Sequence, residues 1–238
     1  MRMVSAVLVL ALALGISGAA SAGKFEDGVA AFDKGDYATA LKAWQPLADK
    51  GDASAQLNVA LLYAKGQGVP QDFKLAADWC RKAADQGVPQ AQLKLGLLYD
   101  NGRGVAQDYA QAAEWYRKAA DQGVAEAQFN LAYMYAKGQG VLQDYPQAMA
   151  LYRKAAAQGV AQAQLNIGLM YQNGRGVPQD FVRAHMWTNI AASQGKAEVG
   201  AAATKDRDLL AKSMTPDQIA RAQELARVCV ASKFKDCD

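Results

Sequence analysis

The sequence is organised around one unit of 36 residues that occurs four times in succession. The copies begin at Gly51, Gly87, Gly123 and Gly159, and a degenerate fifth start falls at Gly195. The second copy reads GVPQAQLKLGLLYDNGRGVAQDYAQAAEWYRKAADQ, and the third reads GVAEAQFNLAYMYAKGQGVLQDYPQAMALYRKAAAQ. A fixed period of this length is typical of stacked architectures, in which each unit buries its apolar face against its neighbours. We therefore expect a long binding surface, and no residue of the repeat supplies a reactive group.

Each copy is predicted to form two helices. In the first stretch, Ala55, Val59 and Tyr63 recur at four-residue steps, which places them on one helical face. The second stretch, 72–85, has apolar residues at steps of three and four, and Asp72 is a suitable N-cap. Two glycines stand in the connector, where the chain needs conformations that are closed to other residues. A phosphate-binding loop is disfavoured there, because such a loop follows a strand.

The spaced pattern A-x-x-x-L/V/I-G/A-x-x-Y-x-x-G-x-G-V-x-x-D-F/Y-x-x-A-x-x-W-x-x-K-A-A-x-x-G runs from Ala55 to Gly87. It returns in the next two copies with small departures. The pattern resembles the Sel-one-like repeat family, a relative of the tetratricopeptide repeats. The resemblance implies an all-α protein, an α-solenoid of helix-turn-helix repeats that forms a right-handed superhelix. It also implies a concave face lined by the first helix of each pair, and an adaptor or scaffold role more often than catalysis.

Residues 1–22 are predicted to be a secretory signal rather than part of the fold. Arg2 gives a positive start, residues 4–16 are almost wholly apolar, and residues 20–22 form an A-x-A cleavage site. The apolar run is shorter than the roughly 20 residues that span a bilayer. We therefore expect a bacterial protein that is periplasmic or secreted, with no stable membrane insertion after the signal is removed.

The remaining chain divides into three predicted parts. Residues 23–50 form a tetratricopeptide-like first unit with a shorter connector, and residues 51–194 hold the four repeats. Residues 195–238 are predicted to form a helical cap, which solenoids need at their open ends. Within the cap, residues 215–218 have the capping-box form, with proline at the first helical position.

The three cysteines have different expected states. Cys229 and Cys237 are eight residues apart, and a disulfide between them is expected in an oxidising compartment. Cys80 occupies a repeat position that otherwise holds a packing side chain. The equivalent residues are Tyr116, Tyr152 and Thr188. We therefore expect Cys80 to be a buried and inert thiol.

The chain offers no recognisable catalytic residue, metal ligand set or cofactor site. His185 is the only histidine, and the equivalent residues Ala77, Ala113 and Met149 indicate a packing role. A metal site would need a cluster of histidine or cysteine ligands. The formal net charge is only +3, and the recurring basic pairs such as Arg81-Lys82 are interpreted as a solvated helix face. Nucleic acid is not expected as a partner, because no basic stripe with stacking aromatics is present.

A candidate binding face lies opposite the packing stripe of each first helix. At about 100° per residue, Asn58 and Leu61 point away from that stripe. The equivalent pairs are Lys94 and Leu97, Asn130 and Tyr133, and Asn166 and Leu169. This row combines hydrogen-bonding groups with apolar or aromatic ones, as the binding of an extended peptide requires. Ordinary packing between repeats explains the same pattern, and the sequence leaves both interpretations open.

The leading functional hypothesis is an exported, non-enzymatic scaffold that binds a protein or peptide in the cell envelope. One alternative is assembly of a larger envelope complex. Another is enzymatic, because a cysteine-rich branch of the family is associated with β-lactam binding and hydrolysis. That branch has a bridging cysteine pair in each repeat, and this chain lacks such pairs in its full copies. Only the spacing of Cys229 and Cys237 resembles it.

Overall fold

The computed structural model describes residues 19–235 and Cys237. Apart from residues 19–22, the predicted signal segment lies outside the described residues. The described chain contains twelve helices and no strand, so the all-α prediction is confirmed. No helix in this part of the chain is long and apolar enough to cross a membrane.

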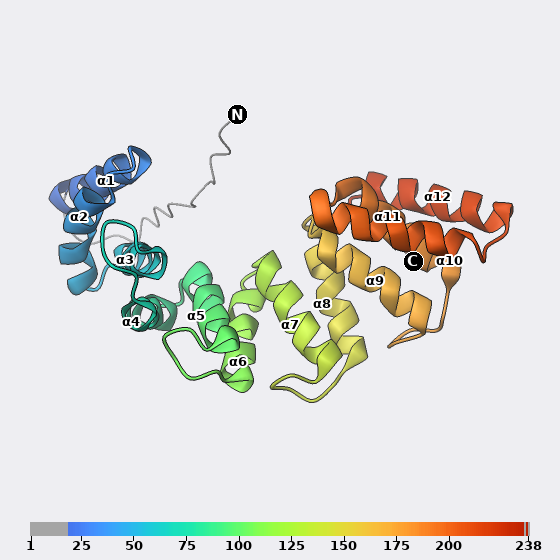
Figure 1. The fold of residues 1–238 in the computed structure, drawn as a ribbon, viewed down its shortest axis with the longest axis horizontal. Helices are drawn as coiled ribbons and strands as arrows, with labels where there is room; N and C mark the ends of the chain where they lie inside the picture. Colours follow the sequence, from blue (N-terminus) through green and yellow to red (C-terminus); the bar gives the residue numbers. More distant parts are fainter. Residues whose placement is uncertain (1–18, 236, 238) are drawn as a thin grey trace. The chain divides into compact units, whose positions relative to one another are not determined.

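The helices follow one another as antiparallel pairs joined by short connectors, as an α-solenoid requires (Figure 1). Their bounds are α1 (Ala19–Asp33), α2 (Tyr37–Asp49), α3 (Ala53–Lys65), α4 (Phe73–Asp85), α5 (Pro89–Asn101), α6 (Tyr109–Asp121), α7 (Ala125–Lys137), α8 (Tyr145–Ala157), α9 (Ala161–Asn173), α10 (Phe181–Gln194), α11 (Ala197–Ala211) and α12 (Pro216–Ala231). The chain divides into two compact units, with the boundary between Lys118 and Ala119. Below, unit 1 is the part up to Lys118 and unit 2 is the part from Ala119 onward.

Side-chain caps and glycines define where the repeat helices begin and end. The Asp72 carboxylate accepts a hydrogen bond from the backbone N–H of Leu75 at 2.9 Å, which confirms its predicted N-cap role. The same cap begins α3, α8 and α10. The first helices of the repeats end at glycines with positive φ, such as Gly66 at 66°. The helix boundaries therefore follow from local residue chemistry.

The second glycine of the connectors is required for two reasons. Gly104 has a φ of +73°, which favours glycine. A Cβ added to Gly104 would also lie 2.0 Å from the carbonyl oxygen of Phe73, at the start of α4 in the preceding repeat. Gly176 repeats this arrangement in unit 2, where an added Cβ would lie 2.7 Å from the Cβ of Tyr145. Each of these connectors therefore packs directly against the backbone of the repeat before it.

A buried glutamine joins each first helix of the repeats to the preceding second helix. The Gln56 side chain is 4% exposed and donates to the carbonyl oxygen of Ala48 at 3.1 Å. The equivalent bonds are Gln92 to Ala84 at 3.3 Å, Gln128 to Ala120 at 3.2 Å and Gln164 to Ala156 at 3.3 Å. The amide at the end of the second helix adds a bond, since Gln86 donates to Gln56 at 2.8 Å. These junctions are thus held by buried amide groups whose N–H donors are hydrogen-bonded.

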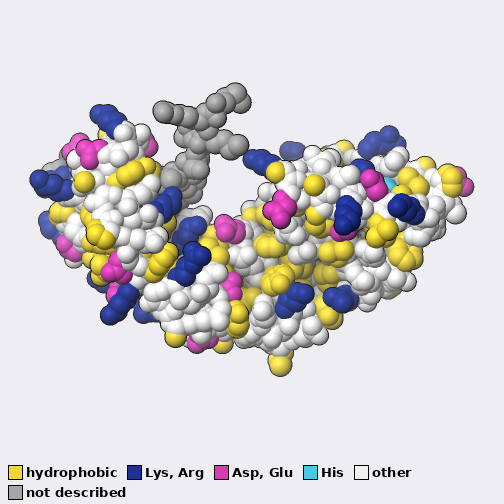
Figure 2. All heavy atoms as spheres, viewed as in Figure 1, with side chains coloured by type: hydrophobic (Ala, Val, Ile, Leu, Met, Phe, Trp, Pro, Cys, Tyr) yellow, Lys and Arg dark blue, Asp and Glu magenta, His cyan; other side chains and the backbone are white. Residues whose placement is uncertain are grey.

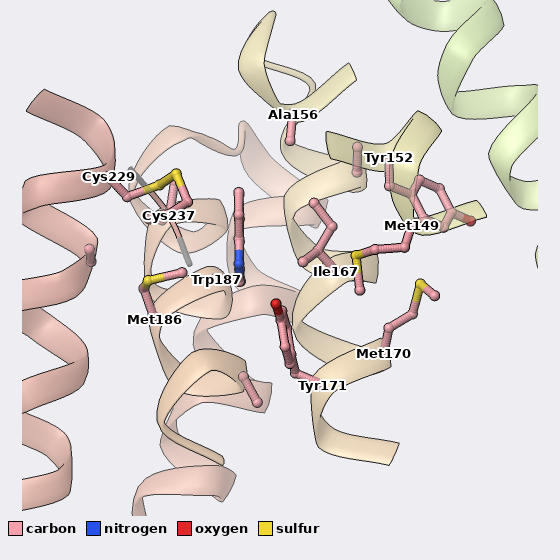
Figure 3. Packing of buried hydrophobic residues seen from close by; sticks show 14 of the residues in the cluster. Met149, Tyr152, Ala156, Ile167, Met170, Tyr171, Met186, Trp187, Cys229 and Cys237 are labelled. Atoms are coloured by element: carbon pink, nitrogen blue, oxygen red, sulfur yellow. A yellow bond between two sulfur atoms is a disulfide. The ribbon is translucent and has the colours of Figure 1, made fainter. Parts of the chain in front are cut away.

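The C-terminal cap packs on α10 with both α11 and α12. Its α12 begins with the predicted capping box, in which Thr215 and Gln218 exchange hydrogen bonds. The structure joins Cys229 to Cys237, with 4.6 Å between their Cα atoms. Figure 3 shows this pair beside Trp187 of α10, and the Phe234 ring stacks on that indole at 6.1 Å. The segment after α12 is therefore fixed to α10 by an aromatic contact and to α12 by a covalent link.

His185 lies inside the contact between α10 and α11. Its side chain is 3% exposed, and Nδ1 has no hydrogen-bond partner among the described residues. Burial lowers the pKa of the imidazole, Arg207 lowers it further, and Asp208 opposes that shift. The predicted packing role is consistent with this environment, because a neutral ring is the form that burial favours.

We expect Gly104→Val to destabilise the fold by about 1–3 kcal/mol or more, because a β-branched residue resists positive φ and its Cβ overlaps the start of α4. Urea unfolding without any ligand measures the change. Ala106→Val is the matched control, since Ala106 is an exposed residue of the same connector. Equal stability of the two variants would contradict the structural role of Gly104.

We expect His185 to make the fold sensitive to acid. Since its pKa is lowered by folding, the unfolded chain binds the proton at higher pH. The stabilising contribution is therefore complete above about pH 6.5 and decreases as the pH falls below that value. His185→Met, which introduces the residue found at the equivalent position 149, removes this term. Its melting temperature should fall less between about pH 7.5 and pH 5 than that of the native chain. Parallel decreases would refute the assignment.

Candidate functional site

In unit 1, the predicted face is less accessible than the sequence alone indicates. Asn58 is only 5% exposed, and its Nδ2 has no partner among the described residues. Leu61, Lys94 and Leu97 are half-buried. Both α2 and α4 pack against α3, the helix that carries Asn58. Packing therefore accounts for Asn58, whereas the other three residues keep surface that a partner can reach.

In unit 2, the same repeat positions are more open. Tyr133 is 43% exposed, which makes it one of the few large apolar side chains on the surface. Asn130, Asn166 and Leu169 are half-buried. Lys137, one helical turn after Tyr133, places its ammonium 5.6 Å from the centre of the phenol ring. The outward face of α7 thus presents an aromatic ring with a cation beside it.

Tyr152 of α8 connects the predicted residues of unit 2 to one another. Its side chain is 2% exposed, and Asn166 of α9 hydrogen-bonds to it. Burial raises the pKa of the Tyr152 hydroxyl, Asn166 lowers it, and the nearby Tyr133 raises it. Figure 3 shows Tyr152 among Met149, Ile167 and Met170 in the core of this unit. Tyr152 of α8 and Asn166 of α9 therefore form a polar contact under the surface, and Tyr133 of α7 is near enough to influence it.

Sequence reasoning treated Tyr152 only as a packing residue. The signal for a second role was present, because the residues at this repeat position in the four copies all have a polar tip. In unit 1, the Tyr116 hydroxyl and the Asp100 carboxylate lie 3.1 Å apart and hydrogen-bond. The tyrosines at this position of the second helices therefore hydrogen-bond to polar residues of the first helices.

Cys80 takes the same position in the first repeat and is chemically shielded. Its side chain is 1% exposed, and the thiol donates to the carbonyl oxygen of Ala91 at 3.2 Å. Burial raises the pKa of the thiol to about 12, although Lys94 and Arg81 lower it. The prediction of a buried thiol is confirmed, and a pKa this high leaves almost no reactive thiolate at neutral pH. The influence of Lys94 also shows that its ammonium lies near this thiol.

The basic pairs on the second helices are only partly solvated: the predicted solvated face was wrong for Arg81 and Arg153, whereas Arg117 is exposed. Arg81 is half-buried and hydrogen-bonds to the Tyr99 hydroxyl of the next repeat. Arg153 donates to the Tyr171 hydroxyl at 2.8 Å in unit 2. These pairs are 18 residues apart in sequence, and only the stacking of repeats brings them together. These two arginines thus connect one repeat to the next, so replacing either would disturb the stacking of repeats as well as the surface charge.

Leu169 is partly covered by α11, a helix that the sequence analysis did not include in the row of first helices. Leu165 and Leu169 pack with Ala191 of α10 and Ala203 of α11. Leu57 and Leu61 pack in the same way with Ala83 and Leu95, which stand at the equivalent positions of α4 and α5. Helix α11 is therefore packed as the first helix of a fifth unit. The signal in the sequence was the degenerate start at Gly195.

The described residues contain no group of three or more histidine, cysteine or carboxylate side chains that could hold a metal ion. The titratable groups with clear pKa shifts are buried or serve as helix caps, as Asp36 does for α2. What the site offers is hydrogen-bonding and contact surface along parallel helices.

Comparison with known proteins identifies the repeat. The Sel1 repeat family matches residues 53–88, 89–124, 125–160 and 161–196. A solved structure of c5321, a protective antigen of uropathogenic Escherichia coli with an SLR fold, has a TM-score of 0.79 and 31% identity over 90% of this chain. The match spans 47% of that protein, so this chain covers about half of its length. No curated protein matches the chain.

A second solved structure, a Sel1 repeat protein from Oxalobacter formigenes, has a TM-score of 0.70 and 28% identity. The match covers 86% of this chain and 99% of that one. The four family matches account for the pairs from α3 to α10, which share the caps, connectors and buried glutamines described above. The chain therefore belongs to the Sel1 repeat family, whose repeats form scaffolds for protein–protein interaction.

Proposed function

We propose that this chain is an exported, non-enzymatic scaffold that binds a protein or peptide of the cell envelope through the outward face of its first helices. The observation that carries the proposal is the exposed Tyr133, held beside Asn130 and above the Tyr152–Asn166 hydrogen bond. Aromatic side chains with a polar tip are frequent anchors of binding energy at interfaces.

The surroundings of Tyr133 favour an extended polypeptide as the occupant. The amides of Asn130 and Asn166 are half-buried, so each keeps an accessible part that can bond a peptide backbone. The Tyr133 ring and Leu169 supply apolar contact area between these amides. Because Tyr152 is buried and hydrogen-bonded, the Asn166 amide is already oriented before a partner arrives. Such preorganisation lowers the entropic cost of binding.

Unit 1 supplies an equivalent but less open surface. Leu61, Lys94 and Leu97 contribute contact area and one positive charge, and Asn58 contributes through packing. We infer that each of the two rows binds polypeptide, as the repetition of the pattern indicates. Assembly of a larger envelope complex would use the same surface chemistry.

Export is supported by the charged start, the apolar run and the A-x-A site of residues 1–22. It is supported independently by the pairing of Cys229 with Cys237, since disulfides persist in oxidising compartments. The bridge closes a loop after α12 and keeps Phe234 on Trp187. By the loop-entropy estimate it adds about 2.5 kcal/mol to the free energy of unfolding.

Protein recovered from the source cell should begin at Gly23 and carry one titratable thiol. That thiol is Cys80, which should react only after denaturation because it is buried. N-terminal sequencing and thiol counting with and without denaturant measure both properties. A chain that retains Met1 would contradict export, and three reactive thiols would contradict the bridge.

Replacing both Asn130 and Tyr133 by alanine should weaken partner binding by about 2 kcal/mol or more, because interface energy concentrates in buried aromatic anchors. The partner is first isolated by co-purification from envelope extract with the native chain as bait. Calorimetric titration of the purified partner then gives the affinities, which should differ by roughly 30-fold.

Lys154→Ala is the matched control for this measurement. Lys154 is exposed on the second helix α8, away from the proposed face, so its removal should leave the affinity unchanged. Circular dichroism checks that each variant is folded. If the Lys154 variant lost binding and the Asn130/Tyr133 variant kept it, the first-helix face would not be the binding surface.

A further inference from the structure

The binding face of unit 2 continues beyond the four family repeats onto α11. This helix is packed as a fifth first helix, because Ala203 meets Leu165 and Leu169 as Leu95 meets the corresponding leucines of α3. In that alignment Lys205 takes the position of Tyr133, and Leu209 takes the position of Lys137. Lys205 is exposed, and Leu209 is 57% exposed. The outward row of unit 2 thus includes α7, α9 and α11.

The exposed face of α11 is hollowed. The hollow is lined by Ala201, Thr204, Lys205, Asp208, Leu209 and Lys212. These residues recur at steps of three and four, so they form one continuous stripe of the helix. Figure 2 shows basic side chains over this part of the molecule, next to a largely apolar surface over α7 to α9.

The charges of this row are unbalanced at its C-terminal half. Within the part of the chain that the structure describes, Lys137, Lys205 and Lys212 form no ion pair with a carboxylate. Asp208 lies in the same hollow, but its carboxylate is paired with Arg207 at 2.7 Å. In this part of the row the three lysines outnumber the one carboxylate of Asp208, so the charge next to Tyr133 and Leu209 is positive on balance.

Two carboxylates of the row lie elsewhere along the helices. Glu126 and Glu198 are in the first turns of α7 and α11. Glu198 precedes Lys205 by two helical turns, a distance of about 10 Å along the axis. That separation is comparable to the screening length at physiological salt, so Glu198 neutralises Lys205 only weakly.

We propose that the partner contributes an extended acidic segment that crosses the C-terminal halves of α7, α9 and α11. Its carboxylates face Lys137, Lys205 and Lys212, and its apolar residues contact Tyr133, Leu169 and Leu209. Neighbouring packed helices lie about 10 Å apart, so the crossing takes about 20 Å, or about six extended residues. This inference rests on the proposed peptide-binding function and adds the chemistry of the peptide and the participation of α11.

Three synthetic peptides with capped ends test the proposal on the mature chain. The first repeats Glu-Leu-Ser, the second replaces each glutamate by glutamine, and the third replaces each glutamate by lysine. Fluorescence anisotropy at low and high salt gives the affinities. We expect the glutamate peptide to bind, the glutamine peptide to bind about tenfold more weakly, and the lysine peptide not to bind. Added salt should weaken only the glutamate peptide, because it screens the ion pairs.

Variants then locate the site. Lys205→Gln combined with Lys212→Gln should weaken the glutamate peptide about five- to tenfold and leave the glutamine peptide unchanged. Both lysines are exposed, so the variant should fold. Lys154→Gln on α8 is the matched control and should change nothing. A glutamate peptide that fails to bind, or whose affinity ignores the Lys205 and Lys212 changes, would overturn the acidic-segment proposal.

The same measurements separate this proposal from the function on which it rests. If glutamate and glutamine peptides bound equally and Tyr133→Ala weakened both, the peptide-binding face would stand and the preference for acid would fall. If Tyr133→Ala changed no affinity while the α11 variant did, the α7 anchor would fall instead. A single-stranded oligonucleotide that competed as strongly as the glutamate peptide would overturn the acidic peptide as the occupant, because it would show affinity for any polyanion.

Discussion

The register of this fold depends on a buried amide at each junction between repeats. Gln56 and its three counterparts are at most 5% exposed, and each donates to the carbonyl oxygen of an alanine eight residues earlier. A polar group buried without a partner is costly, so the first helix can take only the register in which this bond forms. Residues at equivalent positions, 36 apart in sequence, therefore point in the same direction relative to their own repeat. Within each unit, this repeated orientation produces the row of outward residues that we propose as the binding face.

Close approach of the helices imposes a second constraint, which keeps one residue of each facing pair small. A Cβ on Gly96 would lie 2.7 Å from the Tyr116 ring, and a Cβ on Gly168 would lie 2.8 Å from Thr188. Where the second helix carries the smaller Cys80, the facing residue is Ala60. This buried position of the first helices is thus restricted to glycine or alanine, whereas the outward positions differ freely between Asn58, Lys94 and their counterparts. The scaffold is conserved within the chain, and the binding chemistry is what varies between its copies.

The helix pairs, the Asp72 cap and the burial of Cys80 could be predicted from the sequence, because each follows from local spacing and repetition. The contact between Arg81 and Tyr99 was not, since it joins residues from separate repeats whose distance depends on how the units stack. The burial of Asn58 was missed because helical geometry gives a direction on one helix and says nothing of the helices packed on either side. The role of α11 was missed because Ala203, a small residue, carries little periodic signal.

At the end of the row, one helix both closes the stack and carries residues of the proposed binding face. Helix α11 closes α9 and α10 with its buried face, through Ala203 and Leu210, so the stack does not end in an exposed apolar surface. Its opposite face remains exposed and carries Lys205, Leu209 and Lys212. Because His185 lies in the contact between α10 and α11, protonation there weakens the attachment of the helix that bears these lysines. Binding at α11 and the stability of the cap are therefore coupled through one interface, and acid should act on both.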